Sequence, residues 1–150
     1  MVWKPHVTVA AIAHHEGAFL LVEEYAGGQL VLNQPAGHLE PGESLAEAVV
    51  RETREESAWD FQPEAIVGVY RWFSARRNET FLRVCFCGAV RDHRPDQPLD
   101  DGIQRALWVT PDTLRDTPER LRSPLVMRGI EDYQAGCRYP LDLFRDVIAD

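Results

Sequence analysis

Carboxylates are concentrated in one short stretch of the sequence, GHLEPGESLAEAVVRETREES at residues 37–57. Three of them, Glu52, Glu55 and Glu56, fall within five positions. A helix turns by about 100° per residue and would therefore place these side chains within an arc of about 100°. Like charges at i and i+4 cost a helix roughly 0.2–0.5 kcal/mol, and its C-terminal half disfavours acidic groups. Such a local conflict is typical of a functional site.

Two interpretations of this acidic face are open. In the first, the face is solvated surface on which Arg51 pairs with Glu47 and Glu55 at i,i+4 spacing. That arrangement leaves Glu52 and Glu56 without a partner. In the second, the carboxylates bind a hard divalent cation, Mg²⁺ or Mn²⁺, which takes oxygen ligands and completes its shell with water and substrate phosphates.

The loop before the helix, QPAGHLEPGE at residues 34–43, favours the metal site. Its prolines and glycines predict a stiff, turn-rich segment. Gly37 has no side chain, so its backbone can approach closely enough for the carbonyl oxygen to join the ligands. Glu43 precedes Arg51 by eight residues and is predicted to pair with it, which would hold the loop against the helix.

The fixed positions of this stretch resemble the box of the Nudix family, G-x5-E-x7-R-E-U-x-E-E-x-G-U, where U is bulky and aliphatic. The matching residues are Gly37, Glu43, Arg51, Glu52, Glu55 and Glu56. Thr53 departs from the pattern at an aliphatic position and Ala58 at a glycine position, but neither change removes a carboxylate. The segments KPHVTVAAIAHHEGAFLLVEE, LRSPLV and YQAGCRYPLDL also look like bacterial phosphatases of this family.

The resemblance implies a fold, a reaction and a set of site residues. It implies a Nudix-type α/β/α sandwich and a Mg²⁺-dependent hydrolase that releases orthophosphate from nucleoside tri- and diphosphates and from the diphosphate of the thiamine pyrimidine precursor. The implied cation ligands are the carbonyl of Gly37 and the catalytic carboxylates of Glu52, Glu55 and Glu56. Arg51 and Glu43 would order this site.

The remaining roles are assigned from residue type. The proton of the attacking water would go to a helix glutamate or to an acid of the LDDG segment, with Asp101 slightly preferred over Asp100. Arg83 is a candidate for substrate phosphates and Trp72 for stacking on a base, with core packing as the alternative for the aromatic ring. The same roles are open to Arg71, Arg76, Arg77, Tyr25 and Phe73.

Three functions remain possible at this point. The first is the orthophosphate-releasing hydrolase. The second is a Nudix pyrophosphatase that acts on nucleoside triphosphates, ADP-ribose or dinucleoside polyphosphates. The third is a Nudix-like module that binds a nucleotide without cleaving it. Such a module has no reason to keep Glu52, Glu55 and Glu56 on one face, so their presence favours an enzyme.

The elements that must position these residues follow from hydrophobic periodicity and capping signals. Strands are predicted at 6–13, 18–24, 30–34, 65–73, 80–90 and 104–109, and helices at 44–57, from 110 and at 123–136. This order predicts a mixed β-sheet between helices, an α/β or α+β sandwich. The length of 150 residues suits a single domain over residues 1–150.

Composition limits the classes of binding partner and the cellular compartment that we expect. A net charge of −8 argues against a protein that wraps nucleic acid. No apolar run approaches the length of a membrane span and no signal-peptide pattern is present, so we expect a cytoplasmic protein, either a monomer or a homodimer. Cys85 and Cys87 are predicted to be buried thiols, and a zinc site that combines them with His93 or Cys137 is the alternative.

Overall fold

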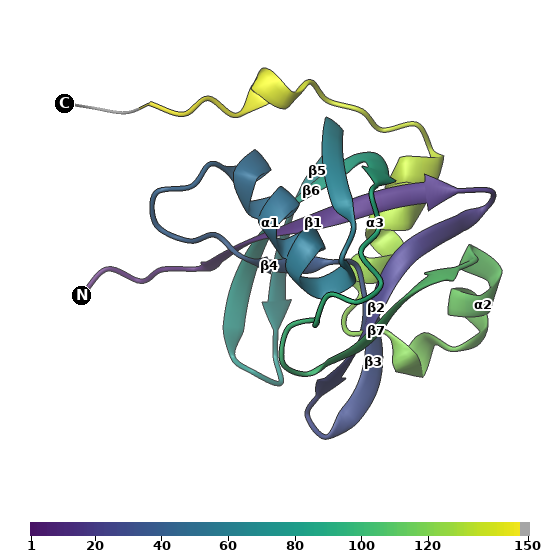
Figure 1. The fold of residues 1–150 in the computed structure, drawn as a ribbon. Coiled ribbons are helices and arrows are strands. Elements are labelled where there is room, and N and C mark those ends of the chain that lie inside the picture. Colours follow the sequence, from purple (N-terminus) through teal and green to yellow (C-terminus); the bar gives the residue numbers. More distant parts are fainter. Residues whose placement is uncertain (148–150) are drawn as a thin grey trace.

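The computed structural model describes residues 1–147 (Figure 1). Its elements are β1 (His6–His15), β2 (Ala18–Ala26), β3 (Gln29–Asn33), β4 (Ala36–His38), α1 (Leu45–Ser57), β5 (Asp60–Ser74), β6 (Glu79–Arg91), β7 (Ile103–Val109), α2 (Pro111–Asp116) and α3 (Leu125–Gln134), with short 3₁₀ turns at Pro118–Arg120 and Leu141–Leu143. The predicted order of strands and helices is therefore confirmed. The sequence did not predict the short strand β4, which follows Pro35 directly.

Strand β5 begins earlier than predicted, at Asp60 rather than Ala65. This early part contains Pro63, and proline is unfavourable in a strand because it cannot donate to a ladder. The structure accommodates it because β5 lies at the edge of the sheet and its register with β6 shifts between Pro63 and Ala65. An edge position and an irregular register are the two settings in which a strand tolerates proline.

The sheet is mixed, as predicted. Its strand order is β3-β2-β1-β6-β5, with β4 paired to β1 and β7 paired to β2. Strands β1 and β6 run parallel, while the other pairs are antiparallel. The central strand β1 is therefore held between β6 on one side and β4 on the other, which places the box loop beside the middle of the sheet.

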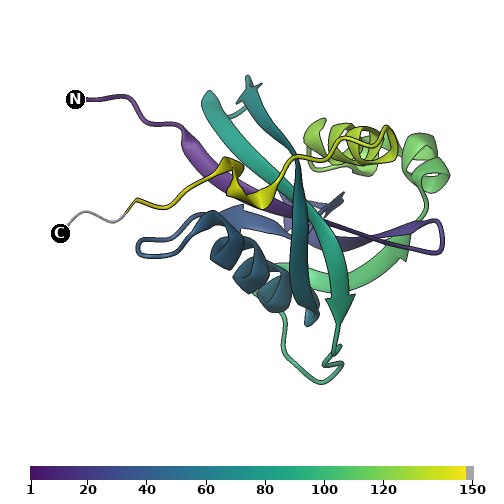
Figure 2. The same cartoon turned by 90° about the horizontal axis from the view of Figure 1, so that it is seen from above.

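Helices cover both faces of the sheet. Figure 2 shows α1 on one side of the twisted strands, with α2 and α3 on the other. Successive side chains of a strand point to opposite faces. Val9 and Ala11 of β1 accordingly pack in the cluster with Val49 of α1, whereas Ala10 and Ile12 pack in the cluster that contains Ile130 of α3. The predicted α/β/α sandwich is thus confirmed, with β1 buried on both faces.

Helix α1 is defined by caps at both ends. Ser44 accepts the amide of Glu47, and the Glu47 carboxylate accepts the amide of Ser44, which completes the predicted capping box. Ala58 takes the left-handed conformation, with φ of 61°, although the family pattern has glycine there. Thr53 is fully buried, and its hydroxyl donates to the carbonyl of Val49 at 2.7 Å. Both departures from the box therefore keep the helix in place.

The segment after α3 returns to the sheet. Tyr139 pairs with Ile66 on the edge strand β5 through two backbone hydrogen bonds of 2.7 and 2.8 Å. Cys85 and Cys87 are buried free thiols, as predicted, and among residues 1–147 no group that could hold a metal includes a cysteine. Within the same range, no helix has the length and apolar character to cross a membrane.

Candidate metal centre and substrate cleft

The acidic face of α1 gathers with one loop residue into a compact carboxylate cluster. Oxygen atoms of Glu52, Glu55 and Asp100 all lie within 4.8 Å of one another. Glu52 is buried, Glu55 is partly buried and Asp100 is exposed, so the cluster opens toward solvent on one side. Three hard oxygen donors at this spacing suit a divalent cation that retains water molecules in its shell.

Gly37 lies directly against this cluster. It sits on β4 opposite Val9, and a Cβ atom at this position would lie 2.2 Å from the Cδ atom of Glu52. Any side chain larger than hydrogen would therefore displace the carboxyl group. The contact explains why glycine is required here by close approach, and it brings the Gly37 backbone to the place that the box resemblance implies.

Glu56 occupies a separate, more enclosed position. Its Oε1 atom accepts the backbone amide of Ala36 at 2.8 Å. Burial raises the pKa of Glu56 to about 9, although the hydrogen bond from Ala36 works in the opposite direction. Burial also raises the pKa of Glu52, and burial together with Asp100 raises the pKa of Glu55. A cation nearby would favour the charged form of each group.

Arg51 holds the box loop and the helix together. Its Nε and one Nη atom donate to the two carboxylate oxygens of Glu43 at 2.9 and 2.7 Å. The same side chain donates to Glu52 at 2.8 Å, to Glu55 at 3.2 Å and to the carbonyl of His38 at 3.1 Å. The predicted ion pair of Glu43 with Arg51 is present, and it lowers the pKa of Glu43.

Two details of the expected charge pairing are wrong. The described residues contain no ion pair of Glu47 with Arg51, because the Glu47 carboxylate accepts the Ser44 amide in the capping box. Glu52 was expected to lack a partner but contacts Arg51 at 2.8 Å. Neighbouring helical side chains do not normally face each other, but the Arg51 guanidinium turns back toward the helix as it reaches the loop. Among the described residues, Glu56 has no cationic partner within 4 Å.

Asp100, rather than Asp101, joins the glutamates. The backbone amide of Asp100 donates to the carbonyl of Glu55 at 3.0 Å, which fixes this residue next to the helix. Asp101 is exposed and lies outside the carboxylate cluster. The preference for Asp101 is therefore not supported by the geometry, since the sequence could not tell which of two adjacent acids points inward.

The loop that carries Asp100 is attached to the end of α1. The last carbonyls of a helix lack partners within it. Here the Arg94 amide donates to the Ala58 carbonyl at 3.0 Å, and the Gln97 side chain donates to the Arg54 carbonyl at 2.7 Å. The Arg94 guanidinium also forms a bidentate pair with Asp60 at 2.9 and 3.1 Å. The loop thus caps the helix that bears the catalytic candidates.

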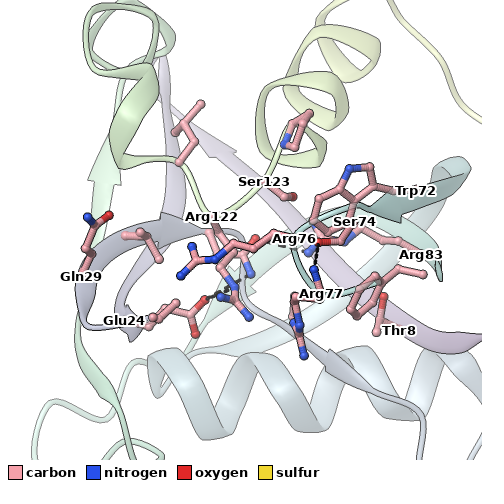
Figure 3. A pocket seen from close by; sticks show the side chains of 18 of the residues that line it. Thr8, Glu24, Gln29, Trp72, Ser74, Arg76, Arg77, Arg83, Arg122 and Ser123 are labelled. Atoms are coloured by element: carbon pink, nitrogen blue, oxygen red, sulfur yellow. Dashed lines mark hydrogen bonds and ion pairs between the residues drawn. The ribbon is translucent and has the colours of Figure 1, made fainter. Parts of the chain in front are cut away.

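A cleft of about 1000 Å³ lies beside the carboxylate cluster (Figure 3). It extends from Gly37 and His38 to Ser123 and Pro124 at the start of α3. Its arginines are Arg76, Arg77, Arg83 and Arg122. Figure 3 shows Glu24 and Gln29 on one side and Trp72, Arg83 and Thr8 on the other.

Both sequence candidates for substrate contact line this cleft. Arg83 is almost completely buried, and Trp72 is partly buried with its ring stacked on Phe81 at 5.5 Å between centroids. Of the other candidates, Arg76, Arg77 and Tyr25 line the cleft. The lining does not include Arg71 or Phe73.

The sequence analysis did not identify two amide residues that contact Arg83. The Arg83 guanidinium donates to Gln34 Oε1 at 3.1 Å and to Asn33 Oδ1 at 3.3 Å. Both amides are buried at the end of β3. Two adjacent buried amides at the end of an apolar strand are the signal that would have pointed to them, because buried polar groups need partners.

Comparisons with known proteins identify the same family as the box resemblance. A model of the NUDIX domain matches residues 4–128. Phosphatase NudJ of Escherichia coli (strain K12) is 42% identical over 144 residues, which cover 96% of this chain and 93% of that protein. Phosphatase NudJ of Shigella flexneri matches with the same values.

Solved structures repeat the fold. A NUDIX hydrolase from Nitrosomonas europaea superposes with a TM-score of 0.94 at 49% identity, over 96% of this chain and 98% of that chain. The NUDIX domain of Shewanella oneidensis NrtR, complexed with ADP ribose, gives a TM-score of 0.70 at 19% identity, over 90% of both chains. This second likeness concerns the fold alone.

Proposed function

Because the chain belongs to the Nudix family and is a Nudix hydrolase, we propose that it cleaves phosphoanhydride bonds of nucleoside tri- and diphosphates and releases orthophosphate. The observation that carries the proposal is the cluster of Glu52, Glu55 and Asp100 at the end of an arginine-lined cleft. Carboxylates that bind a cation, next to arginines that suit phosphate, are the parts that phosphoryl transfer needs.

The proposed metal is Mg²⁺, with Mn²⁺ as a substitute. The donor set fits because Glu52, Glu55 and Asp100 offer hard oxygen atoms and Gly37 leaves its backbone open to the same space. The carbonyl of Gly37 and the carboxylate of Glu56 would complete the set. When bound, such a cation lowers the pKa of water and offsets charge on the phosphates.

The other side chains hold this arrangement in place. Arg51 ties Glu43 in the loop to Glu52 on the helix, so it would keep the ligands oriented. We assign acceptance of the proton of the attacking water to Asp100, because Asp100 and not Asp101 lies beside the glutamates. Arg83 and Trp72 would contact the organic part of the substrate within the cleft.

The substrate range is proposed from the relatives. Release of orthophosphate is supported by 42% identity to proteins named Phosphatase NudJ. The diphosphate of the thiamine pyrimidine precursor is a second proposed substrate. A pyrophosphatase acting on triphosphates, ADP-ribose or dinucleoside polyphosphates is the alternative. A cytoplasmic location and a monomeric or homodimeric state remain predictions.

One assay tests the proposal. The protein with Mg²⁺ is incubated with nucleoside tri- and diphosphates, ADP-ribose and the thiamine pyrimidine diphosphate, and orthophosphate and pyrophosphate are measured separately. Orthophosphate should be the main product, and Glu56→Gln should abolish turnover. Glu131→Gln removes an exposed carboxylate of α3, away from the site, and is the matched control. Pyrophosphate from triphosphates would favour the alternative, and full activity of Glu56→Gln would contradict the catalytic assignment.

A further inference from the structure

Arg83 is a buried cation without a counter-ion. Its side chain belongs to a residue that is only 7% exposed, and among the described residues no carboxylate lies within 4 Å of its guanidinium. A guanidinium carries five N–H donors. Two hydrogen bonds go to the amide oxygens of Asn33 and Gln34, and the Nε atom has no acceptor. The Nε atom is itself buried, whereas each Nη atom keeps one further N–H, and these two donors are the ones that a ligand in the cleft can engage.

The two amides fix the orientation of the guanidinium. The amide nitrogen of Gln34 donates to the carbonyl of Val126 on α3 at 2.8 Å, and that of Asn33 faces Glu24 at 3.5 Å. With the nitrogen of each amide engaged, its oxygen is directed at Arg83. The plane of the Arg83 donors is therefore set before any ligand arrives.

An aromatic platform lies beside these donors. Phe81 precedes Arg83 by two residues on β6 and so projects from the same face of the strand. Trp72 is opposite Phe81 on β5, and the two rings stack at an interplanar angle of 29°. Both rings line the cleft. A flat donor group next to a flat ring suits a planar ligand that stacks and accepts hydrogen bonds in its own plane.

The cation site would place the phosphates. Gly37 and His38 line the cleft and adjoin the carboxylate cluster, where a cation would bind phosphate. His38 and Arg83 both pair with Thr8 of β1, so this part of the cleft is continuous with the space at Arg83. Besides its arginines the lining carries Glu24 and Glu119, and Glu24 pairs with Arg122 at 3.6 Å. Arg83 itself contacts neutral amides, so an uncharged heterocycle joined to the phosphates can accept its remaining N–H groups.

We propose that Arg83, held by Asn33 and Gln34, recognises the acceptor edge of a planar heterocycle that stacks on Trp72. The matching chemistry is an exocyclic carbonyl oxygen beside a ring nitrogen, as in O6 and N7 of a 6-oxopurine, which arginine binds in bidentate fashion. A 6-aminopurine presents an amino donor to the guanidinium and is disfavoured. This inference rests on the proposed function and concerns its nucleotide substrates, among which it favours those with an oxo-heterocycle.

The test compares two ligands that share N7 and differ in the group on C6 and in the proton on N1. IMP and AMP are titrated into the wild-type protein with Mg²⁺ by calorimetry, and kcat/KM is measured for IDP and ADP. IMP should bind at least about tenfold more tightly, since one bidentate contact is worth roughly that factor or more. Equal affinity for IMP and AMP, or a preference for AMP, would overturn the proposal.

Two arginine variants separate recognition from charge. Arg83→Lys keeps the positive charge but loses the planar fork. It should therefore lower the affinity for IMP about tenfold and leave the affinity for AMP nearly unchanged. Arg76 is another arginine of the cleft lining, and its guanidinium lies against Gly27. Arg76→Lys makes the same chemical change there and is the charge-matched control, and it should affect the affinities for IMP and AMP by the same factor. If Arg83→Lys still prefers IMP to AMP, Arg83 does not recognise the heterocycle. The same conclusion follows if the substitution lowers the affinity for inorganic pyrophosphate as much as the affinity for IMP.

Failure of this inference and failure of the proposed function have different signatures. Ligand binding is measured with monophosphates, which need no turnover, and folding of each variant is checked by thermal denaturation. If Arg83→Lys does not fold, the ratio of IMP to AMP affinity in the wild-type protein still decides. If no diphosphate is hydrolysed but IMP binds more tightly than AMP, the proposed hydrolysis is wrong and the assignment of Arg83 to the heterocycle holds.

Discussion

The acidic face of α1 holds buried carboxyl groups, whereas the cleft beside it holds a buried guanidinium. The two regions differ in what surrounds these groups. The carboxylates of Glu52, Glu55 and Glu56 have raised pKa values, chiefly because they are buried, and Arg83 has a lowered pKa for the same reason. The first region gathers charges of one sign and so requires a cation. The second surrounds one charge with neutral amides and rings, and so suits an uncharged acceptor. In our proposal the first region serves the reaction and the second serves the choice of substrate.

Removal of the divalent cation should abolish turnover, which depends on the acidic region, and leave binding of the heterocycle in the cleft intact. With a chelator, turnover should fall to background, because the carboxylate cluster cannot place the phosphates without a cation. Inosine, which carries no phosphate, should still bind near Trp72 with unchanged affinity, measured by tryptophan fluorescence. Loss of inosine binding on chelation would mean that the cleft depends on the metal site.

A methyl group at Gly37 should damage the acidic region alone. The Cβ atom of Gly37→Ala would lie 2.2 Å from Glu52 Cδ, so the carboxyl group must move by more than an ångström. A displacement of that size costs about 100-fold in activity. We expect a fall of about that factor in kcat/KM at fixed Mg²⁺, with the IMP-to-AMP affinity ratio unchanged. In a Glu52→Asp background, whose shorter side chain leaves room, the same substitution should cost much less.

The two regions also differ in how far the sequence alone predicts them. Glu52, Glu55 and Glu56 lie on one helix, so their spacing fixes their common face, and the capping box of Ser44 and Glu47 fixes where that helix begins. Local chemistry was enough to predict the shared helix face, but not that the compact cluster contains Glu52 and Glu55 without Glu56. It was not enough to choose between Asp100 and Asp101, because that choice depends on which amide reaches the Glu55 carbonyl.

The cleft depends on contacts between distant parts of the chain. Arg83 and Asn33 are 50 residues apart, and Gln34 reaches Val126 across 92 residues. No periodic pattern in the sequence reports such contacts, so Arg83 was only one of several candidate arginines. The strand β4 and the early start of β5 at Asp60 were missed for a similar reason, since Pro35 and Pro63 argue locally against strands that pairing with neighbours stabilises.

The pH dependence of stability should report the acidic region. Glu56 has a pKa of about 9 in the folded chain and an ordinary value of 4.5 otherwise. The folded state then binds the proton more tightly, so the contribution of Glu56 to the free energy of unfolding is complete below pH 4.5 and is lost as pH rises toward 9. The slope should approach about 1.36 kcal/mol per pH unit.

Urea unfolding with a chelator, at about pH 6 and about pH 8, measures this slope. Glu56→Gln cannot titrate at this position, so the variant should lose less stability between the two conditions than the wild type. Mg²⁺ should reduce the wild-type slope, because the cation and the proton compete for the carboxylate. A wild-type slope that matches the variant would show that Glu56 is ionised in the folded chain.

Substitution of Arg94 tests whether the loop that carries Asp100 contributes to the reaction at the acidic region. Arg94→Gln removes the bidentate pair with Asp60 and should loosen the loop that caps α1. Loss of a supporting contact of this kind typically costs about tenfold or somewhat more. We expect kcat to fall by about tenfold while the affinity for IMP is unchanged, because Arg94 does not line the cleft.

The double variant shows whether Arg94 acts through Asp100. If it does, Arg94→Gln should add little to Asp100→Asn, since the positioned carboxylate is already absent. Arg91→Gln removes a nearby exposed arginine and is the matched control. Fully multiplicative losses in the double variant would indicate general destabilisation of the loop instead.

Ala58 should give the smallest effect, because two opposing contributions nearly cancel. Glycine at a left-handed position relieves about 1 kcal/mol of backbone strain. The Ala58 methyl group, however, belongs to a residue that is only 2% exposed, and its loss costs about 0.8 kcal/mol of burial. Ala58→Gly should therefore change the free energy of unfolding by less than about 0.5 kcal/mol, measured by thermal denaturation, with kcat/KM unchanged. A large stabilisation would mean that the methyl group contributes no packing, and that the family glycine was lost here without compensation.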